Sequence, residues 1–335
     1  MTKKIKDTDY LAVSARVRAM ENSLLTRERM EQVLEARTDE EAVKILQECG
    51  YPELDPARPE AMDAALSQVR EATLADLSDG IPDARYLDIF KLKYDYHNVK
   101  ALLKAEAMGT DAAHMLMDMG RVPVAELKAA MESGHLEELP PCLAAAAEEA
   151  RSVLNTTRDP QLSDMVLDLA EQQQALSMAK ETGSAFLEGY VSRQIDCNNL
   201  RTAVRLTRME KGLDYMARAI APGGQVPADV FYAREGMTPD WLERMLAGTV
   251  LAPALPSAKA ALEGEGFARL DKACDDILIE YARGARFVPF GEQTVIAYLL
   301  ANEAEFSAVR TILAGKNAGL SSEKIVERLR ESYVV

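Results

Sequence analysis

The sequence of 335 residues has few cysteines, few aromatic residues and no long apolar run. Its four cysteines stand far apart and form no C-x-x-C pair, which excludes a disulfide scaffold and indicates free thiols in a reducing compartment. No run of about 18 apolar residues occurs, so we expect no membrane-spanning helix. Residues 1–9 are charged and lack the apolar stretch of a signal peptide. These absences indicate a cytoplasmic protein without direct membrane insertion.

Basic residues are also in short supply relative to acidic ones. The chain has 39 Lys and Arg against 54 Asp and Glu, which gives a formal net charge of −15. Such a charge repels nucleic-acid phosphate and anionic lipid, so a nucleic-acid partner is not expected. With 48% hydrophobic and 28% charged residues, the composition is that of a folded globular chain.

The sequence carries no recognisable nucleotide-binding or catalytic motif. Near Gly315-Lys316 the phosphate-binding loop pattern fails, since Arg310 occupies the place of the first glycine and Asn317 follows the lysine. The three histidines lack the paired spacing of metal ligands, and no G-x-S-x-G sequence is present. We therefore expect no catalytic residue, no metal site and no cofactor. An all-helical enzyme with a site built from scattered carboxylates is the alternative that this pattern supports least.

What is present is helix-forming sequence with helix boundaries marked along the chain. Ala, Leu, Met, Glu and Arg are plentiful, and alternating strand patterns are almost absent, so the fold class is all-α with less than a tenth in strand. A capping box at Thr38–Glu41 opens one helix, and Gly50 followed by Pro52 ends it. We expect helices over residues 10–36, 38–50, 59–77, 84–108, 160–182, 184–211, 267–283, 292–314 and 322–332, with shorter ones between 227 and 267.

A repeat with a period of about 100 residues is the most informative feature. Residues 95–103 (DYHNVKALL) are echoed at 196–204 (DCNNLRTAV) and more weakly at 305–313 (EFSAVRTIL), with spacings of 101 and 109 residues. The sequence GRVP at 120–123 returns as GQVP at 224–227. Markers that stay in register indicate related helical modules. We predict three, over 1–110, 111–212 and 213–335, with the N-terminal helix able to pack against the last.

The charged and amide side chains of these copies are the candidate residues for a partner interface or for contacts between modules. On a helix, an acid and an Asn three residues later share one face. Salt bridges that tie modules together, or solvated helix faces, explain the same residues without a partner. The candidates are Lys91, Lys93, Asp95, Asn98, Lys100, Asp196, Asn199, Arg201, Glu305 and Arg310.

Four segments resemble one known family. They are ARVRAMENSLL at 15–25, FKLKYDYHNVKALL at 90–103, PFGE at 289–292 with the helix that follows, and GLSSEKIVERLRESYV at 319–334. Together they are similar to the C subunit of V-type and A-type ATPases, the counterpart of the d subunit in the eukaryotic vacuolar enzyme. The resemblance runs in order from Tyr10 to Val334. One departure is the third repeat, where Glu305 replaces Asp and Ala308 replaces Asn.

The resemblance implies three similar helical modules arranged as a pseudo-threefold funnel. It also implies a non-catalytic central-stalk component of a rotary ATPase or ATP synthase, placed between the shaft, which is made by the D and F subunits, and the membrane rotor ring of c or K subunits. Such a component is peripheral to the membrane and transmits torque for proton or sodium transport. A freestanding helical-repeat adaptor that binds protein partners in a concave surface is the alternative function.

Overall fold

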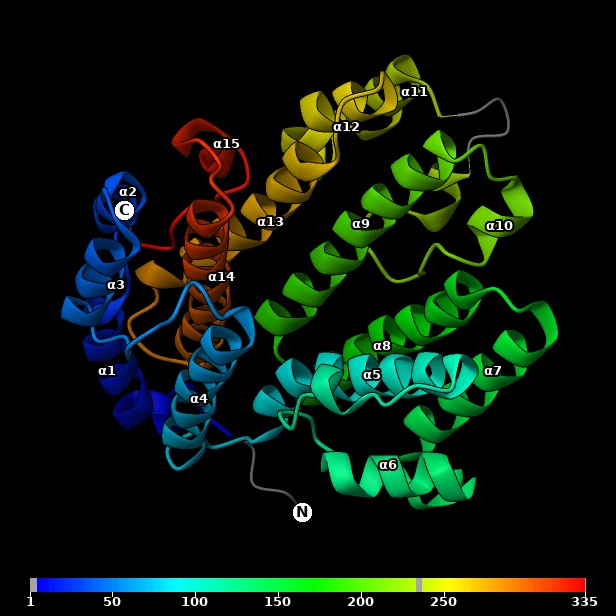
Figure 1. Cartoon of the computed structure of the whole chain (residues 1–335), viewed down its shortest axis with the longest axis horizontal. Coiled ribbons are helices and arrows are strands. Elements are labelled where there is room, and N and C mark those ends of the chain that lie inside the picture. Colours follow the sequence, from blue (N-terminus) through cyan, green and yellow to red (C-terminus); the bar gives the residue numbers. More distant parts are fainter. Residues whose placement is uncertain (1–4, 233–236, 335) are drawn as a thin grey trace. The chain divides into compact units, whose positions relative to one another are not determined.

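A computed structural model describes residues 5–232 and 237–334, and within these ranges it contains helices and no strand (Figure 1). The all-α class is therefore confirmed. The chain divides into two compact units: residues 1–84 with 238–335, and residues 85–237. Their boundaries lie at 84/85 and 237/238, not at the junctions 110/111 and 212/213 proposed for three modules. The division into three modules stays a prediction.

The unit formed by residues 85–237 is a stack of long helices around α8. Helix α8 packs against α5, α7 and α9, and α6 packs against α5. The apolar side chains of α5 to α8 form one core, in which Tyr96, Leu127 and Leu167 are completely buried. The α-helices are α5 (Arg85–Met108), α6 (Val124–Ser133), α7 (Pro141–Thr157), α8 (Pro160–Thr182), α9 (Ala185–Arg208) and α10 (Leu213–Ala217), with 3-10 turns at Ala113–Met115, Leu136–Glu138 and Ala228–Phe231.

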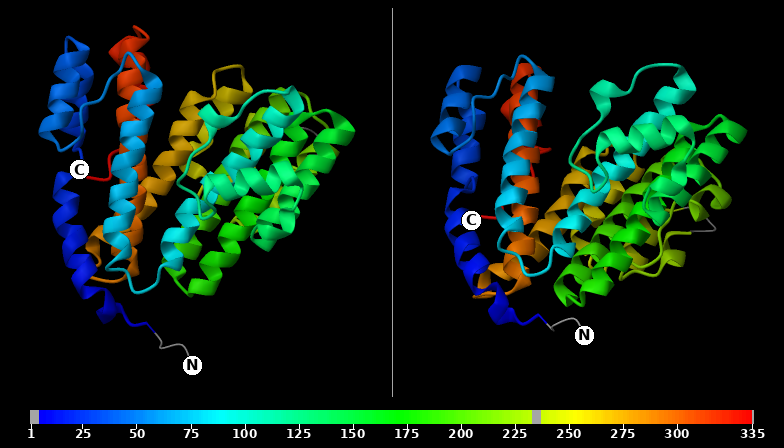
Figure 2. Two further views of the ribbon diagram at one scale, coloured as in Figure 1. Left: turned by 60° about the horizontal axis from the view of Figure 1, so that its bottom comes forward. Right: turned by 90° about the horizontal axis from the view of Figure 1, so that it is seen from below.

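The other unit is organised around α14, which contacts α1, α2, α3, α4, α13 and α15. Figure 2 shows this helix beside the first helices of the chain, so the unit joins the beginning of the sequence to its end. The α-helices are α1 (Leu11–Met20), α2 (Arg27–Glu35), α3 (Asp39–Glu48), α4 (Pro59–Ser78), α11 (Pro239–Leu246), α12 (Leu255–Leu262), α13 (Ala268–Arg283), α14 (Glu292–Asn317) and α15 (Ser322–Val326), with 3-10 turns at Asp7–Tyr10, Glu21–Ser23, Ala252–Ala254 and Gly284–Phe287.

Most of the expected helices occur within three residues of their predicted ends, but two do not. The helix expected over 10–36 is interrupted by an extended backbone at Leu24, and Thr26 then caps a new helix by accepting the Arg29 N–H at 3.2 Å. The last helix ends at Val326 instead of near 332. The expected ranges also left out α6 and α7. Between them these two helices supply a large share of the core beside α5 and α8.

The core of residues 85–182 generates a first prediction. We expect Leu127→Ala to lower the free energy of unfolding by about 2–5 kcal/mol, because the side chain is completely buried and its removal leaves a cavity. Met108→Ala, at a side chain that is 75% exposed, is the matched control and should change the free energy by less than about 0.5 kcal/mol. Urea unfolding followed by circular dichroism measures both. Equal losses in the two variants would contradict this packing.

Candidate functional site

The first copy of the repeat places a carboxylate inside the fold. Asp95 lies midway along α5 and is only 2% exposed. Its Oδ1 accepts the backbone N–H of Arg121 at 2.8 Å and of Val122 at 3.1 Å. Burial raises the pKa of Asp95, and the two backbone N–H groups act against that shift by stabilising the charged form. The carboxylate thus holds the loop that precedes α6.

Asn98, one helical turn further on, binds the same loop. Its Nδ2 donates to the Met117 carbonyl at 2.8 Å, and its Oδ1 accepts the Met117 N–H at 2.9 Å. The Asn98 side-chain amide therefore satisfies both the backbone N–H and the backbone carbonyl of Met117, as the backbone of a neighbouring β-strand would. Together, Asp95 and Asn98 fix residues 117–122 against α5. His97, between them, is exposed and has its Nε2 3.0 Å from the Met115 carbonyl.

The second copy repeats these hydrogen bonds 101 residues later. Asp196 on α9 is completely buried and accepts the N–H of Gln225 at 2.9 Å and of Val226 at 3.0 Å. Asn199 donates to the Ala221 carbonyl and accepts the Ala221 N–H, both at 2.8 Å. Burial raises the pKa of Asp196, again opposed by the two backbone donors. The two copies therefore perform the same structural task, and the Asp and Asn share one face as expected.

Glycine is required where the loop passes the carboxylate. A Cβ at Gly120 would lie 2.0 Å from Oδ1 of Asp95, and a Cβ at Gly224 would lie 2.0 Å from Oδ1 of Asp196. Both carboxylates are buried and held by two N–H groups, so moving either one aside breaks its hydrogen bonds. This close approach explains why GRVP and GQVP recur in register with the two acids.

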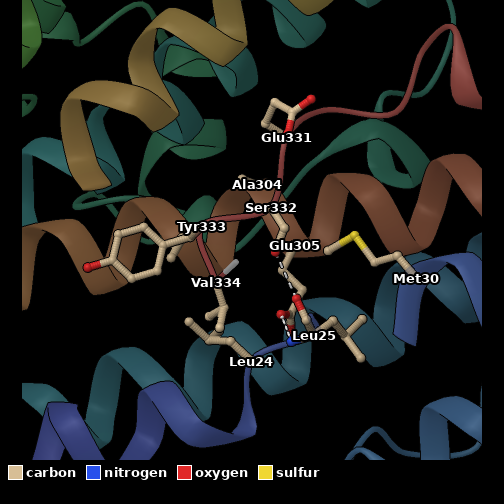
Figure 3. Close-up of a pocket in the computed structure, with 10 residues that line it drawn as sticks. Leu24, Leu25, Met30, Ala304, Glu305, Glu331, Ser332, Tyr333 and Val334 are labelled. Carbon is tan, nitrogen blue, oxygen red and sulfur yellow. Dashed lines mark hydrogen bonds between the residues drawn. The ribbon is translucent and has the colours of Figure 1, made fainter. Parts of the chain in front are cut away.

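The third copy holds a different part of the chain. Glu305 on α14 is buried, and its Oε2 accepts the N–H of Leu25 at 2.5 Å (Figure 3). Its Oε1 accepts the hydroxyl of Tyr51, also at 2.5 Å. Because the N–H of Leu25 donates to Glu305, it does not donate to a helical carbonyl. This accounts for the break between α1 and α2. The ring of Tyr51 packs edge-on against Phe306, with the ring centroids 6.3 Å apart. Ala308 has no side-chain amide, and the hydroxyl of Tyr51 takes the place of the second backbone N–H that donates to the aspartate in each of the other two copies.

The surroundings of Glu305 leave almost no space. A cavity of about 10 Å³ lies beside it, lined by residues of α14, the α1–α2 junction and the C-terminal segment (Figure 3). That volume is the minimum for one water molecule. Ser332, which also lines the cavity, donates to the Leu25 carbonyl at 2.9 Å. Burial raises the pKa of Glu305 to about 7, opposed by the hydrogen bonds from Tyr51 and Leu25.

Two basic residues of the repeats form ion pairs inside their own unit. Lys100, on α5, pairs with Asp168 of α8. Arg310, at the same repeat position on α14, has Nε and Nη2 each 2.8 Å from a carboxylate oxygen of Asp63 on α4. Both pairs are partly exposed, so each contributes little to the free energy of unfolding. The first pair joins α5 to α8, and the second joins α14 to α4.

The remaining basic candidates lie on α5 and α9. Lys93 is exposed, with its Nζ 4.9 Å from the ring centre of Tyr94, and Lys91 is half-buried. Arg201 is half-buried and donates to Oδ1 of Asn198 at 3.2 Å. The structure thus separates the ten candidates: five polar side chains are buried in loop contacts, Lys100 and Arg310 pair with a carboxylate of another helix, and Lys91, Lys93 and Arg201 lie on α5 and α9.

Sequence reasoning did not anticipate Leu25 and Tyr51 as partners of Glu305. Both are more than 250 residues away from it along the chain, and neither belongs to a repeated pattern. The replacement of Asp by Glu and of Asn by Ala in the third copy was the available signal. Among residues 5–232 and 237–334, no group of three or more His, Cys, Asp or Glu could hold a metal ion. Over the same residues, no helix is long and apolar enough to span a bilayer.

The structure is that of an all-α protein in which α5 and α9 hold the following loop through the same buried Asp and Asn pair, and comparison with known proteins gives its family. The family model described as ATP synthase (C/AC39) subunit matches residues 13–328, so the chain belongs to this family. It is 24% identical over 330 residues to the C subunit of the V-type sodium ATPase of Enterococcus hirae, covering 97% of this chain and 99% of the relative. It is 25% identical to the C subunit of the A-type ATP synthase of Methanocaldococcus jannaschii, covering 97% and 87%.

The two loop glycines give a testable consequence. We expect Gly120→Ala and Gly224→Ala each to lower the free energy of unfolding by about 1–3 kcal/mol, because the added Cβ displaces a buried carboxylate from its N–H donors. Gly248→Ala is the control, since a Cβ there meets no atom within 4 Å. Thermal unfolding of the three variants measures the effect. If Gly120→Ala were as stable as Gly248→Ala, the loop could not be held as described.

The raised pKa of Glu305 predicts a pH-dependent stability. From an ordinary value of 4.5 the pKa rises to about 7, so the folded state binds the proton more tightly than the unfolded chain does. The stabilisation of the folded state that comes from this proton on Glu305 is then fully present below about pH 4.5 and is lost as the pH rises through 7. Glu305→Gln does not titrate, so its stability relative to the parent should increase by about 2–3 kcal/mol between pH 5 and pH 8.

Urea unfolding at the two pH values measures this difference. Glu327→Gln, at an exposed position of the chain, serves as the control and should show no such change. A stability difference between Glu305→Gln and the parent that is the same at pH 5 and pH 8 would show that Glu305 titrates normally in the folded protein.

Proposed function

We propose that this protein is a non-catalytic central-stalk component of a rotary ATPase or ATP synthase, which couples the shaft formed by the D and F subunits to the membrane rotor ring. The observation that carries the proposal is the family match over residues 13–328, together with relatives named as C subunits that align along nearly the whole chain. The matched region includes all three copies of the repeat, so the resemblance extends to the helices that carry the buried carboxylates.

We also propose that the chain is built from three similar modules in cyclic order, forming a pseudo-threefold funnel. In each module a long helix carries a buried carboxylate that holds a loop. The first begins at α5 and includes α6 to α8, and the second begins at α9, so on this proposal the boundaries shift from 110/111 and 212/213 to the starts of these helices. The third is α14 with α2 to α4, closed by Glu305 on Leu25. Two apolar cores support this scheme, because one combines α5 to α8 and the other combines α14 with α2 to α4.

A rotary coupler must transmit torque without changing shape. Closely packed helices have low compressibility, and hydrogen bonds from backbone N–H groups to the buried carboxylates prevent the loops from sliding along the helices. On this proposal the five buried polar residues of the repeats stiffen the protein, while partner contacts fall to exposed cations. Lys93, just before the first repeat, is the residue that we propose for such a contact.

Co-purification tests the proposal directly. The tagged chain, expressed with the D and F subunits and the rotor ring of its own complex, should retain both on an affinity column after detergent extraction. Lys93→Glu should reduce the recovery of one of the two partners at least threefold, because the Lys93 side chain is exposed and its charge is reversed. Lys44→Glu, at an exposed lysine of α3, is the charge-matched control.

Each result has a distinct meaning. If the parent chain retains neither the D–F shaft nor the ring, it is not the coupling component, and the freestanding adaptor becomes the better explanation. If the parent binds both partners and Lys93→Glu behaves like Lys44→Glu, the coupling function stands and Lys93 lies outside the interface.

A further inference from the structure

The loop between α13 and α14 exposes an aromatic side chain. Phe287 is 91% exposed, the highest value among the large apolar side chains of residues 5–232 and 237–334. It ends the 3-10 turn Gly284–Phe287 and is followed by half-buried Val288. A phenylalanine on a mobile loop has no fixed orientation for binding a partner. The contacts that hold this loop therefore determine whether Phe287 is presented in one orientation.

The loop is held on both sides of Phe287 by one guanidinium group. Nη2 of Arg18, on α1, donates to the carbonyl of Ala285 at 2.8 Å and to the carbonyl of Val288 at 2.6 Å. Nη1 of the same side chain lies 2.7 Å and 2.9 Å from the two carboxylate oxygens of Glu21. Because Arg is planar and makes several bonds at once, it sets the loop in one geometry.

Further contacts from α1 and from the C-terminal segment also hold the loop. The N–H of Gly291, at the end of the loop, donates to Oγ of Ser14 at 3.2 Å, so α1 holds the loop at three points. Glu21 also accepts the hydroxyl of Tyr333 at 3.1 Å, and the guanidinium of Arg286 lies 5.9 Å from the centre of the Tyr333 ring. Helix α1 and the C-terminal segment are therefore both used to hold the loop, and they leave Phe287 exposed.

An aromatic side chain on a fixed loop has the properties of an interface anchor. Residues that dominate protein interfaces are mostly large and sit in well-packed pockets of the partner. Fixing them before binding lowers the entropic cost of association. Arg286, which is exposed and directly precedes Phe287, is the one charged residue of 284–291, so the loop presents a cation beside the aromatic ring in a chain of net charge −15. Arg283 belongs to α13 and pairs with Glu280 and Glu331.

We propose that Phe287 is an anchor residue that inserts into an apolar pocket with an acidic rim on a partner protein of the rotary complex. This proposal rests on the proposed function. A membrane surface fits the observations less well, because a single acyl chain already gives only marginal, reversible attachment to a bilayer. One phenylalanine on a strongly acidic chain provides less apolar surface than that, and the net charge opposes anionic lipid.

Binding measurements with separate partners test the proposal. The parent chain, Phe287→Ala and Met108→Ala are titrated by biolayer interferometry against the immobilised D–F shaft and, separately, against the detergent-solubilised rotor ring. Met108 is also strongly exposed and lies in the other unit, which makes it the matched control. We expect Phe287→Ala to weaken binding to one partner at least tenfold, and Met108→Ala to leave both affinities unchanged. The melting temperatures of the two variants should equal that of the parent.

A second variant tests whether Arg18 holds the loop in the binding geometry. Arg18→Lys keeps the positive charge but cannot bridge two carbonyls and a carboxylate, so Arg18 acts as a positioning residue. We expect it to weaken the same interaction by a smaller factor than Phe287→Ala. The double variant Arg18→Lys, Phe287→Ala should bind no more weakly than Phe287→Ala alone, a result that a purely destabilising change would not give.

Other outcomes overturn the proposal in distinguishable ways. If Phe287→Ala binds both partners as tightly as the parent does, Phe287 is not an anchor residue, and the proposed function stands. Failure of the parent to bind either partner removes the proposed function and the anchor with it. If the parent binds protein-free vesicles containing anionic lipid and Phe287→Ala does not, the loop binds membranes instead of a protein.

Discussion

A carboxylate buried in a helix determines how each part of this structure is assembled. An ionised group removed from water is destabilising unless donors surround it. Asp95 and Asp196 meet that requirement with pairs of backbone N–H groups from loops 26 to 30 residues further along the chain. The loop can approach so closely only where glycine precedes the donors. The helix and the loop after it therefore have a single arrangement, and the helices that follow begin from a fixed point.

The third carboxylate applies the same constraint between distant parts of the sequence. Glu305 is one methylene longer than Asp and reaches Leu25 and Tyr51, which precede it by 280 and 254 residues. The hydrogen bond from Ser332 to the Leu25 carbonyl then secures the C-terminal segment at the same place. Three segments that are far apart along the chain are thereby fixed to one another around α14. None of the three can move without breaking buried hydrogen bonds, which is the stiffness that the proposed coupling function requires.

The sequence predicted those features that depend on neighbouring residues. Gly50, Pro59 and Gly183 end or begin helices through local backbone geometry, and the structure has helix boundaries beside all three. The pairing of Asp with Asn on one face was also predictable, because three residues make nearly one helical turn. The break at Leu24 was not, since nothing in residues 10–36 shows that Glu305 will take the Leu25 N–H. The exposure of Phe287 likewise depends on Arg18, some 270 residues earlier.

Amide hydrogen exchange, read by mass spectrometry or NMR, tests most directly whether buried carboxylates hold these loops. The N–H groups of Val122, Val226 and Leu25 lie outside α-helices, where amides usually exchange within seconds to minutes. If the carboxylates hold them as described, these three should exchange as slowly as amides in the middle of α5 and α14, and far more slowly than the amide of Gly248. Exchange at the rate of an ordinary surface loop would contradict the account, because the loops would then open independently of the helices.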